Sequence, residues 1–216
     1  MSPPTHNRPP GFLLSSLSRS HVPAGGGVYL VKAEREEMIM AMTSEVTVST
    51  GTATHATIRS NLGDLTVVAR GGPVTGLYFP HHWHLPDRAS FGQYRDAGFD
   101  DVRRQLDEYL AGARREFDLP VETAGSPLQE RVWQLIGRIP YAETVSYGEL
   151  ARELGDGVTA QEVGAAVGRN PVSIIVPCHR VVGASGSLTG YAGGLRRKRI
   201  LLDLERDVAG RSARLF

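Results

Sequence analysis

The chain has 216 residues, of which 41% are hydrophobic and 22% charged, and its formal net charge is +1. This is the composition of an ordinary globular protein of one or two domains, and the balanced charge alone favours neither a nucleic-acid-binding nor a membrane-surface protein. The single cysteine excludes an internal disulfide framework and a zinc site built from several cysteines. It fits a reducing compartment, and no apolar run reaches the length of a membrane span. We therefore expect a cytoplasmic protein that does not associate with membranes.

Residues 1–50 are predicted to form a disordered leader. Residues 1–40 contain five of the thirteen prolines, a run of three glycines and many serines. A segment of this composition buries too little apolar surface to fold. A transit peptide is the alternative, because no acidic residue precedes Glu34. Methionines at 38, 40 and 42 also allow a later start of translation.

Residues 51–124 are predicted to form a small N-terminal α/β domain. Apolar and turn residues alternate over residues 54–80, which predicts a three-stranded meander. Residues 99–116 predict a helix, with Val102, Leu106 and Tyr109 on one face. The Pro and Gly residues around positions 120–125 indicate a boundary, so a second domain is expected over residues 125–210 and a tail over 211–216.

Three histidines, His81, His82 and His84, flank Trp83. Such a cluster could bind a metal, but zinc usually takes four ligands and no cysteine lies nearby. We predict a surface or partly buried loop here, and no metal site.

The second half predicts short helices that begin at capping boxes. Ser126, Ser146 and Thr159 are each followed three residues later by Gln or Glu. A Gly-Asp-Gly sequence at 155–157 separates the second and third helices, and the third ends before Asn170-Pro171. Two short helices joined in this way are a candidate helix-turn-helix, although many helical hairpins of this spacing bind no DNA.

The third of these helices is narrow on one side, because it carries Gly164, Ala165, Ala166 and Gly168. Glycine inside a helix costs about 1 kcal/mol relative to alanine, so the two glycines require a reason. One reason is close approach to a nucleic-acid groove. The alternative is close packing against a neighbouring element of the same protein.

The lone cysteine, Cys178, follows an apolar run at 172–176 that we expect to be a buried strand, and it precedes His179 and Arg180. A base and a cation beside a thiol favour the nucleophilic thiolate. The alternative is a small buried hydrophobic residue. Because neighbouring residues of a strand point to opposite faces, His179 need not contact the sulfur directly, and a bridging water could connect the two.

Three motifs together identify a family. They are Pro-Cys-His-Arg-Val-Val at 177–182, Gly-Arg-Asn-Pro at 168–171 and Gly-Tyr-Ala-Gly-Gly-Leu at 190–195. With them the chain resembles the methylated-DNA–protein-cysteine methyltransferases, or O6-alkylguanine-DNA alkyltransferases, strongly over residues 126–206 and more loosely back to the meander. The resemblance implies an α+β fold: a ribonuclease-H-like N-terminal domain and a mostly helical, winged-helix-like C-terminal domain with a helix-turn-helix.

The resemblance also implies a function. A monomer without a cofactor would bind double-stranded DNA and flip out O6-alkylguanine, or O4-alkylthymine. It would transfer the alkyl group irreversibly to Cys178 and act only once. Two rivals from other classes are a DNA-damage-binding protein of the same fold that lacks the reactive cysteine, and a Cys/His hydrolase. The Cys178-His179 pair argues against both.

By the same resemblance, His179 is the general base and Glu205 supports it, while Tyr147 donates a hydrogen bond or proton to the leaving guanine. Asn170 would fix the turn before the active-site segment. The carbonyls of Cys178 and Val181 would accept from the exocyclic amine of the base, and a loop of Tyr191, Ala192 and Gly193 would close the pocket, with the Ala192 amide facing O6. The residues implied to contact the minor groove are Ala160, Gln161, Gly164, Ala165 and Arg169. From the residues alone, Glu205 could equally be a solvated surface residue and Tyr147 an ordinary core residue.

Two positions depart from the family pattern. Many members carry an arginine where this chain has Gln161, and that arginine takes the place of the flipped base. Glutamine is shorter and uncharged, so the departure puts the efficiency of flipping in doubt. The common serine of the pocket loop is here Ala192, which matters little if the contact is made by the backbone.

Overall fold

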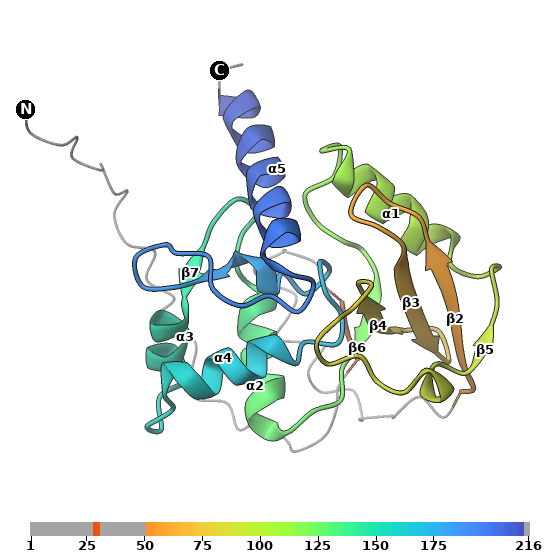
Figure 1. Cartoon of the computed structure of the whole chain (residues 1–216), viewed down its shortest axis with the longest axis horizontal. Coiled ribbons are helices and arrows are strands. Elements are labelled where there is room, and N and C mark those ends of the chain that lie inside the picture. Colours follow the sequence, from red (N-terminus) through yellow and green to blue (C-terminus); the bar gives the residue numbers. More distant parts are fainter. Residues whose placement is uncertain (1–27, 31–50, 214–216) are drawn as a thin grey trace, which may run out of the picture.

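The computed structural model of the chain describes residues 28–30 and 51–213. The fold is α+β, with a mixed sheet on one side and a group of helices on the other (Figure 1). The sheet has six strands in the order β1-β6-β4-β3-β2-β5. Their bounds are β1 Val28–Leu30, β2 Ala53–Ile58, β3 Leu65–Arg70, β4 Val74–Tyr78, β5 Gln93–Tyr94 and β6 Pro120–Glu122.

The predicted meander is present as β2, β3 and β4, which pair antiparallel in chain order. Its alternating pattern buries Ala56, Ile58, Leu65 and Val67 on the face that meets the rest of the protein. The sequence did not indicate β1, β5 and β6, because strands of two or three residues are too short to show a period. β1 lies inside the predicted leader and pairs antiparallel with β6, so for residues 28–30 the expectation of disorder was wrong. The remaining residues of the predicted leader lie outside the described part of the chain.

The helix expected over residues 99–116 is shorter in the structure, where α1 spans Asp100–Leu110. Its predicted face is buried, with Val102, Leu106 and Tyr109 in the core. The helix ends at Leu110, with Ala111 as its C-cap, because Gly112 adopts a φ of 75°, where a Cβ would lie 2.7 Å from the side chain of Val208. A 3₁₀ turn, η3 (Arg88–Phe91), lies between β4 and β5.

The three predicted capping boxes are all formed. They begin α2 (Pro127–Gly137), α3 (Tyr147–Leu154) and α4 (Ala160–Gly168). In each box the cap hydroxyl accepts from the backbone N–H of the third helical residue, whose side chain accepts in return from the N–H of the cap. The glycines at 155 and 157 have φ of 65° and 72°, which turns the chain sharply between α3 and α4. The helix-turn-helix is therefore present as predicted.

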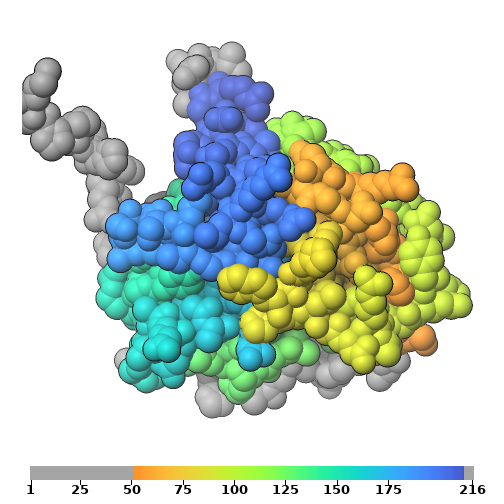
Figure 2. All heavy atoms as spheres, in the orientation of Figure 1, coloured from red at the N-terminus to blue at the C-terminus, as the bar shows by residue number. Residues whose placement is uncertain are grey.

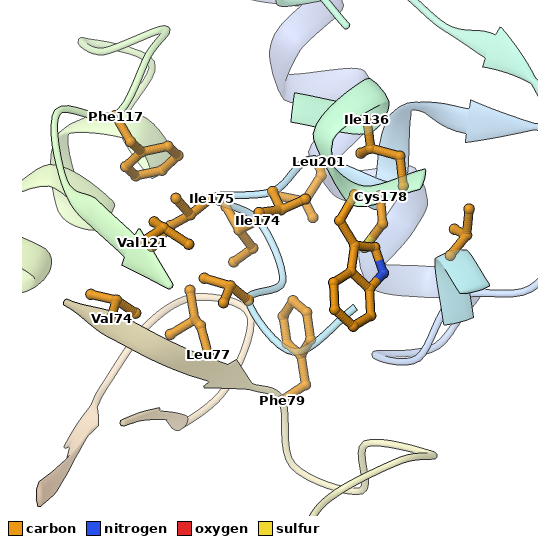
Figure 3. Close-up of a cluster of buried hydrophobic side chains, with 14 of the residues drawn as sticks. Val74, Leu77, Phe79, Phe117, Val121, Ile136, Ile174, Ile175, Cys178 and Leu201 are labelled. Carbon is orange, nitrogen blue, oxygen red and sulfur yellow. The ribbon is translucent and has the colours of Figure 1, made fainter. Parts of the chain in front are cut away.

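The expected buried strand at 172–176 is not a straight strand. Val172 bridges to Leu77 of β4, and the chain then folds back so that Ser173 bridges to Val176. At the turn Ile174 has a φ of 72°, which is a strained conformation for a β-branched residue. The side chains of Ile174 and Ile175 point into the core that the two halves share, close to Leu77 and Val121 (Figure 3).

Two further elements complete the helical half. A parallel pair of short strands, β7 (Val145–Ser146) and β8 (Val181–Val182), joins the start of α3 to the residues after the Cys-His-Arg sequence. The long helix α5 (Leu195–Ala213) was not predicted, and residues 211–213 of the expected tail belong to it. No helix among the described residues is long and apolar enough to cross a membrane. The division into domains near residue 125 stays a prediction, because one apolar core runs through both halves.

Candidate active site around Cys178

Cys178 begins a 3₁₀ turn, η4 (Cys178–Arg180), instead of ending a strand. The turn follows from the fold-back at Ile174, after which the N–H of Cys178 donates to the carbonyl of Val176 at 2.8 Å. Cys178 is 3% exposed, and burial raises the pKa of its thiol. Hydrogen bonds from Asn170 and Ser173 and the charge of Lys198 act in the opposite direction without cancelling the effect of burial. The thiol is thus protonated at neutral pH, and a base is needed to make it nucleophilic.

His179 is fully buried and its two ring nitrogens have different surroundings. Nε2 lies 2.8 Å from Oε1 of Glu205, so its proton is held by that carboxylate. Nδ1 is buried and has no hydrogen-bond partner among the described residues. Burial lowers the pKa of His179, as do the charges of Arg180 and Lys198, although Glu205 raises it. A neutral imidazole that donates its Nε2 proton in a hydrogen bond to Glu205 carries no proton on Nδ1. The lone pair of Nδ1 is therefore available to take a proton.

Glu205 is a fully buried carboxylate on α5, and the reading of it as a solvated surface residue is wrong. Arg180 donates to both of its oxygens from Nε at 3.1 Å, and the backbone N–H of Ala142 donates to Oε2 at 2.9 Å. Ala142 reaches this position with a φ of 65°. Burial by itself would raise the pKa of Glu205, but the hydrogen bond from His179 and the charges of His179 and Arg180 outweigh it and hold the pKa at about 2.

The position of Arg180 corrects one expectation. We expected its charge to favour the Cys178 thiolate directly, but its guanidinium is bound to Glu205 and, through NH1, to the carbonyl of Ile139 at 2.6 Å. The cation that acts on the thiol is Lys198, about two turns before Glu205 on the same face of α5. Lys198 was not predicted as a site residue, because the sequence did not indicate the helix α5 that carries it.

Lys198 is buried and its ammonium donates to three backbone carbonyls. They belong to Val181 at 2.6 Å, Thr189 at 2.8 Å and Gly190 at 3.2 Å. Burial lowers its pKa to about 8. The side chain therefore fixes the ends of the segment 181–190 beside Cys178. It also means that the Val181 carbonyl, one of the predicted acceptors for the base, already has one donor.

Tyr147 is the first residue of α3 and is half-buried rather than an ordinary core residue. The β7–β8 pairing places it beside the active-site turn, and its hydroxyl donates to the carbonyl of Thr189 at 3.3 Å. Burial raises its pKa, so the hydroxyl keeps its proton at neutral pH and can act as a donor.

The predicted pocket loop, residues 191–193, lies between two glycines of positive φ, Gly190 and Gly194. The ring of Tyr191 packs edge-on against Phe79, and Arg197 lies over that same phenylalanine. Gly193 contacts the Phe79 ring so closely that a Cβ would lie 2.4 Å from it. The carbonyl of Ala192 accepts from the N–H of Trp83 at 3.3 Å. The loop is thus held by residues of the N-terminal half, which the sequence did not indicate.

Asn170 connects α4 to the active-site turn. It is buried, its Nδ2 donates to the carbonyl of Val176 at 2.9 Å, and its Oδ1 accepts from the N–H of Val172 at 3.0 Å. The preceding helix is fixed from its other side by Trp133, whose indole N–H donates to the carbonyl of Ala166 at 2.9 Å.

The residues predicted to contact DNA share one outward face of α4. Ala160, Gln161, Ala165 and Arg169 are exposed, and Gly164 is half-exposed between them. The helix α4, cyan in Figure 2, lies on the surface of the molecule, near the blue segment that follows β8. A Cβ at Gly164 would meet only the Tyr147 ring, at 3.8 Å, and one at Gly168 would meet nothing within 4 Å. Packing inside the protein therefore does not require either glycine.

The histidine cluster near Trp83 is a loop, and His82 is buried within it. Its ring packs edge-on against Tyr78, and burial together with the nearby His84 lowers its pKa to about 4. Among the residues that the structure describes, no group of three His, Cys, Asp or Glu side chains is placed to hold a metal ion.

This arrangement has counterparts in known proteins. A family profile described as "6-O-methylguanine DNA methyltransferase, DNA binding domain" matches residues 127–207, and one described as its "ribonuclease-like domain" matches residues 54–123. The chain belongs to this family. The two matched regions are the helical half and the sheet half of the fold.

Individual members of the family match one half or more of the chain's described residues. The methylated-DNA–protein-cysteine methyltransferase of Mycobacterium tuberculosis H37Rv is 44% identical over 162 residues, which are 75% of this chain and 98% of the relative. The inducible enzyme of that name from Bacillus subtilis 168 is 49% identical over 102 residues, 47% of this chain and 57% of the relative. The crystal structure of M. tuberculosis OGT in complex with DNA superposes with a TM-score of 0.69 at 44% identity, covering 72% of this chain and 94% of that one.

Proposed function

We propose that the chain repairs O6-alkylguanine in double-stranded DNA by moving the alkyl group onto its own Cys178. The observation that carries the proposal is that the one cysteine lies next to a buried His179–Glu205 pair. His179 uses Nε2 to bind Glu205, and its other nitrogen, Nδ1, has no hydrogen-bond partner among the described residues. Membership of the 6-O-methylguanine DNA methyltransferase family supports it.

The first half of the reaction is the activation of the thiol. His179 Nδ1 takes the proton of Cys178 through a water molecule, and Glu205 stabilises the imidazolium that forms. Glu205 can do so because its pKa of about 2 keeps it ionised. The sulfur then attacks the alkyl carbon, a C–S bond forms and the bond between that carbon and guanine O6 breaks. The electron pair of the broken bond stays on the guanine.

The second half is stabilisation of the leaving guanine. Tyr147 donates a hydrogen bond, or its proton, as negative charge develops on the base, which requires it to leave its partner at Thr189. The Ala192 amide faces O6, and the carbonyls of Cys178 and Val181 accept from the exocyclic amine. Because Cys178 is only 3% exposed, the base enters when the loop 191–193 moves about its flanking glycines.

The guanine reaches this pocket by leaving the duplex. The outward face of α4 lies in the minor groove, where Gly164 and Ala165 permit close approach and Gln161 fills the space of the flipped base. The thioether that forms on Cys178 is a stable bond, so the alkyl group stays on the protein and each molecule acts on one lesion. We propose that the protein works as a monomer and without a cofactor.

A transfer experiment tests the proposal. Duplex DNA with a labelled methyl group on guanine O6 is incubated with the wild-type chain and with Cys178→Ser, and binding to the same duplex is measured by gel shift. We expect label on the wild-type protein only, and equal binding by both, because the helix-turn-helix is unchanged. Binding without transfer by the wild type would indicate a damage-binding protein. Loss of both activities in Cys178→Ser would mean that the cysteine is structural.

A further inference from the structure

Glu205 has a contact that comes from the other half of the molecule. The hydroxyl of Tyr109, on α1, donates to Oε1 of Glu205 and lies 3.3 Å from Nε2 of His179. The other groups that contact this carboxylate are His179, Arg180 and the backbone of Ala142, all from the helical half. Among these hydrogen-bond partners of Glu205 in the described part of the chain, Tyr109 is the one that the sheet half provides.

The Tyr109 hydroxyl is held in place by packing. The residue is 0% exposed, and its ring lies 5.0 Å from that of Phe117 and edge-on to that of Tyr141 at 6.0 Å. α1 presents it to the core together with Val102 and Leu106. A ring enclosed in this way has few alternative rotamers, so its hydroxyl is a fixed donor.

We propose that Tyr109 is a positioning residue for the alkyl transfer, holding the Glu205 carboxylate against His179 from the sheet half of the molecule. The proposal rests on the proposed function and adds a member to its catalytic network. The oxygen that accepts from Tyr109 is Oε1, the same atom that accepts from His179. Tyr109 therefore acts on the atom that determines how strongly the imidazole holds its protons.

The direction of the effect follows from charge. A hydroxyl that donates to Oε1 draws negative charge away from the His179 side, so the imidazolium is stabilised less. Removing the hydroxyl leaves more charge for His179 and raises its pKa. The charged and titratable groups that face the cluster come from several elements. They are Cys178 and Arg180 from η4, Lys198 and Glu205 from α5, Tyr109 from α1, Tyr147 from α3, Tyr191 from the pocket loop, and Tyr141, over whose ring Arg115 and Arg180 lie. Tyr109 itself does not titrate near neutral pH, because burial and Glu205 raise its pKa far above the ordinary value.

The variant Tyr109→Phe tests the proposal, because it keeps the ring and removes only the hydroxyl. Tyr141→Phe is the matched control, since it changes the adjoining ring, whose hydroxyl is buried and has no partner among the described residues. Single-turnover transfer from methylated duplex is measured between pH 5 and 9 for the three proteins, and His179 is titrated by NMR in each.

We expect Tyr109→Phe to shift the acid limb of the rate profile and the His179 titration to higher pH. A rise of about half to one pH unit lowers the rate on the acid limb by about three- to tenfold and changes the plateau little. Tyr141→Phe should keep the wild-type profile. A rate that falls equally at every pH, with an unchanged His179 titration, would show that Tyr109 is only a packing residue and would overturn the proposal. Absence of transfer by the wild type would instead refute the proposed function.

Discussion

The side-chain amide of Asn170 joins the end of α4 to the active-site turn, donating to the carbonyl of Val176 at 2.9 Å and accepting from the N–H of Val172 at 3.0 Å. These two residues bound the fold-back that carries Ile174 at positive φ. The position of Cys178 relative to α4 therefore depends on one buried side chain. The α4 face and the thiol are arranged as one unit rather than as two separate sites.

Replacing Asn170 with alanine should damage the pocket more than the DNA surface. The N–H of Val172 would be buried without an acceptor, which costs about 1–3 kcal/mol of stability. Transfer should slow on duplex DNA and on free O6-methylguanine base alike, because the cysteine is displaced in both cases. Urea unfolding and single-turnover rates check this. Slowing on duplex alone would mean that Asn170 serves DNA binding and not the pocket.

Replacing Gly164 with alanine should stabilise the protein and impair its action on DNA. The new Cβ meets only the Tyr147 ring at ordinary contact distance, and alanine favours a helix by about 1 kcal/mol. On the DNA side the same methyl group hinders close approach of α4 to the groove. We expect a higher midpoint in urea and slower transfer from duplex, with free base unaffected.

The control for Gly164→Ala is Glu162→Gln, which alters the same helix without widening its narrow face. Glu162 is exposed and completes the capping box with Thr159, which glutamine can also do. This variant should transfer from duplex at least as fast as the wild type. If Gly164→Ala also leaves duplex transfer unchanged, the narrow face is not a DNA contact.

Gln161 should limit the rate on duplex DNA. It is the second residue of α4 after the Thr159 cap, and its exposed side chain carries an amide with no charge. Since unstacking a base costs a few kcal/mol, even a partial substitute for the flipped base matters. Gln161→Arg should speed transfer from duplex and steepen its dependence on salt, while Gln161→Ala should slow it. Transfer from free base is the internal control, and equal slowing of both substrates by Gln161→Ala would contradict this role.

Glu205→Gln should destabilise the fold in a pH-dependent way. It leaves Arg180 buried without its counter-charge, which costs about 3–5 kcal/mol at neutral pH. The pKa of Glu205 is about 2 in the folded protein and higher in the unfolded chain, so the unfolded state binds the proton first as pH falls. The contribution of Glu205 is complete above pH 5 and is lost towards pH 2. Urea midpoints of both proteins from pH 7 to 3 should converge, and a constant difference would contradict the ion-pair account.

The sequence predicted those parts of the site that local patterns encode. Capping boxes marked the first residues of α2, α3 and α4, and the meander followed from its alternation. The short strands β1, β5 and β6 were missed because they form only by pairing with distant segments. The turn at Ile174 was missed for a related reason: an apolar run of five residues has the same appearance whether it is straight or folded back.

The chemical environment of the site was less accessible than its residues. Arg180 was placed beside the thiol because it is close in sequence, whereas its partner is Glu205, which α5 brings in from the end of the chain. Lys198 and Tyr109 were missed as site residues because their roles exist only after α5 and α1 pack on η4. Contacts of this kind depend on the tertiary structure and leave no local signal.

The central claim, that Cys178 is the final and single acceptor of the alkyl group, is tested most directly by following the methyl group to its end point. Wild-type protein is mixed with an excess of duplex containing O6-methylguanine, the methyl groups removed from DNA are counted against protein molecules, and the modified residue is located by peptide mass spectrometry. We predict a plateau at one methyl group per protein, all of it on Cys178. Removal of more methyl groups than there are protein molecules, or a methyl group on any other residue, would contradict it.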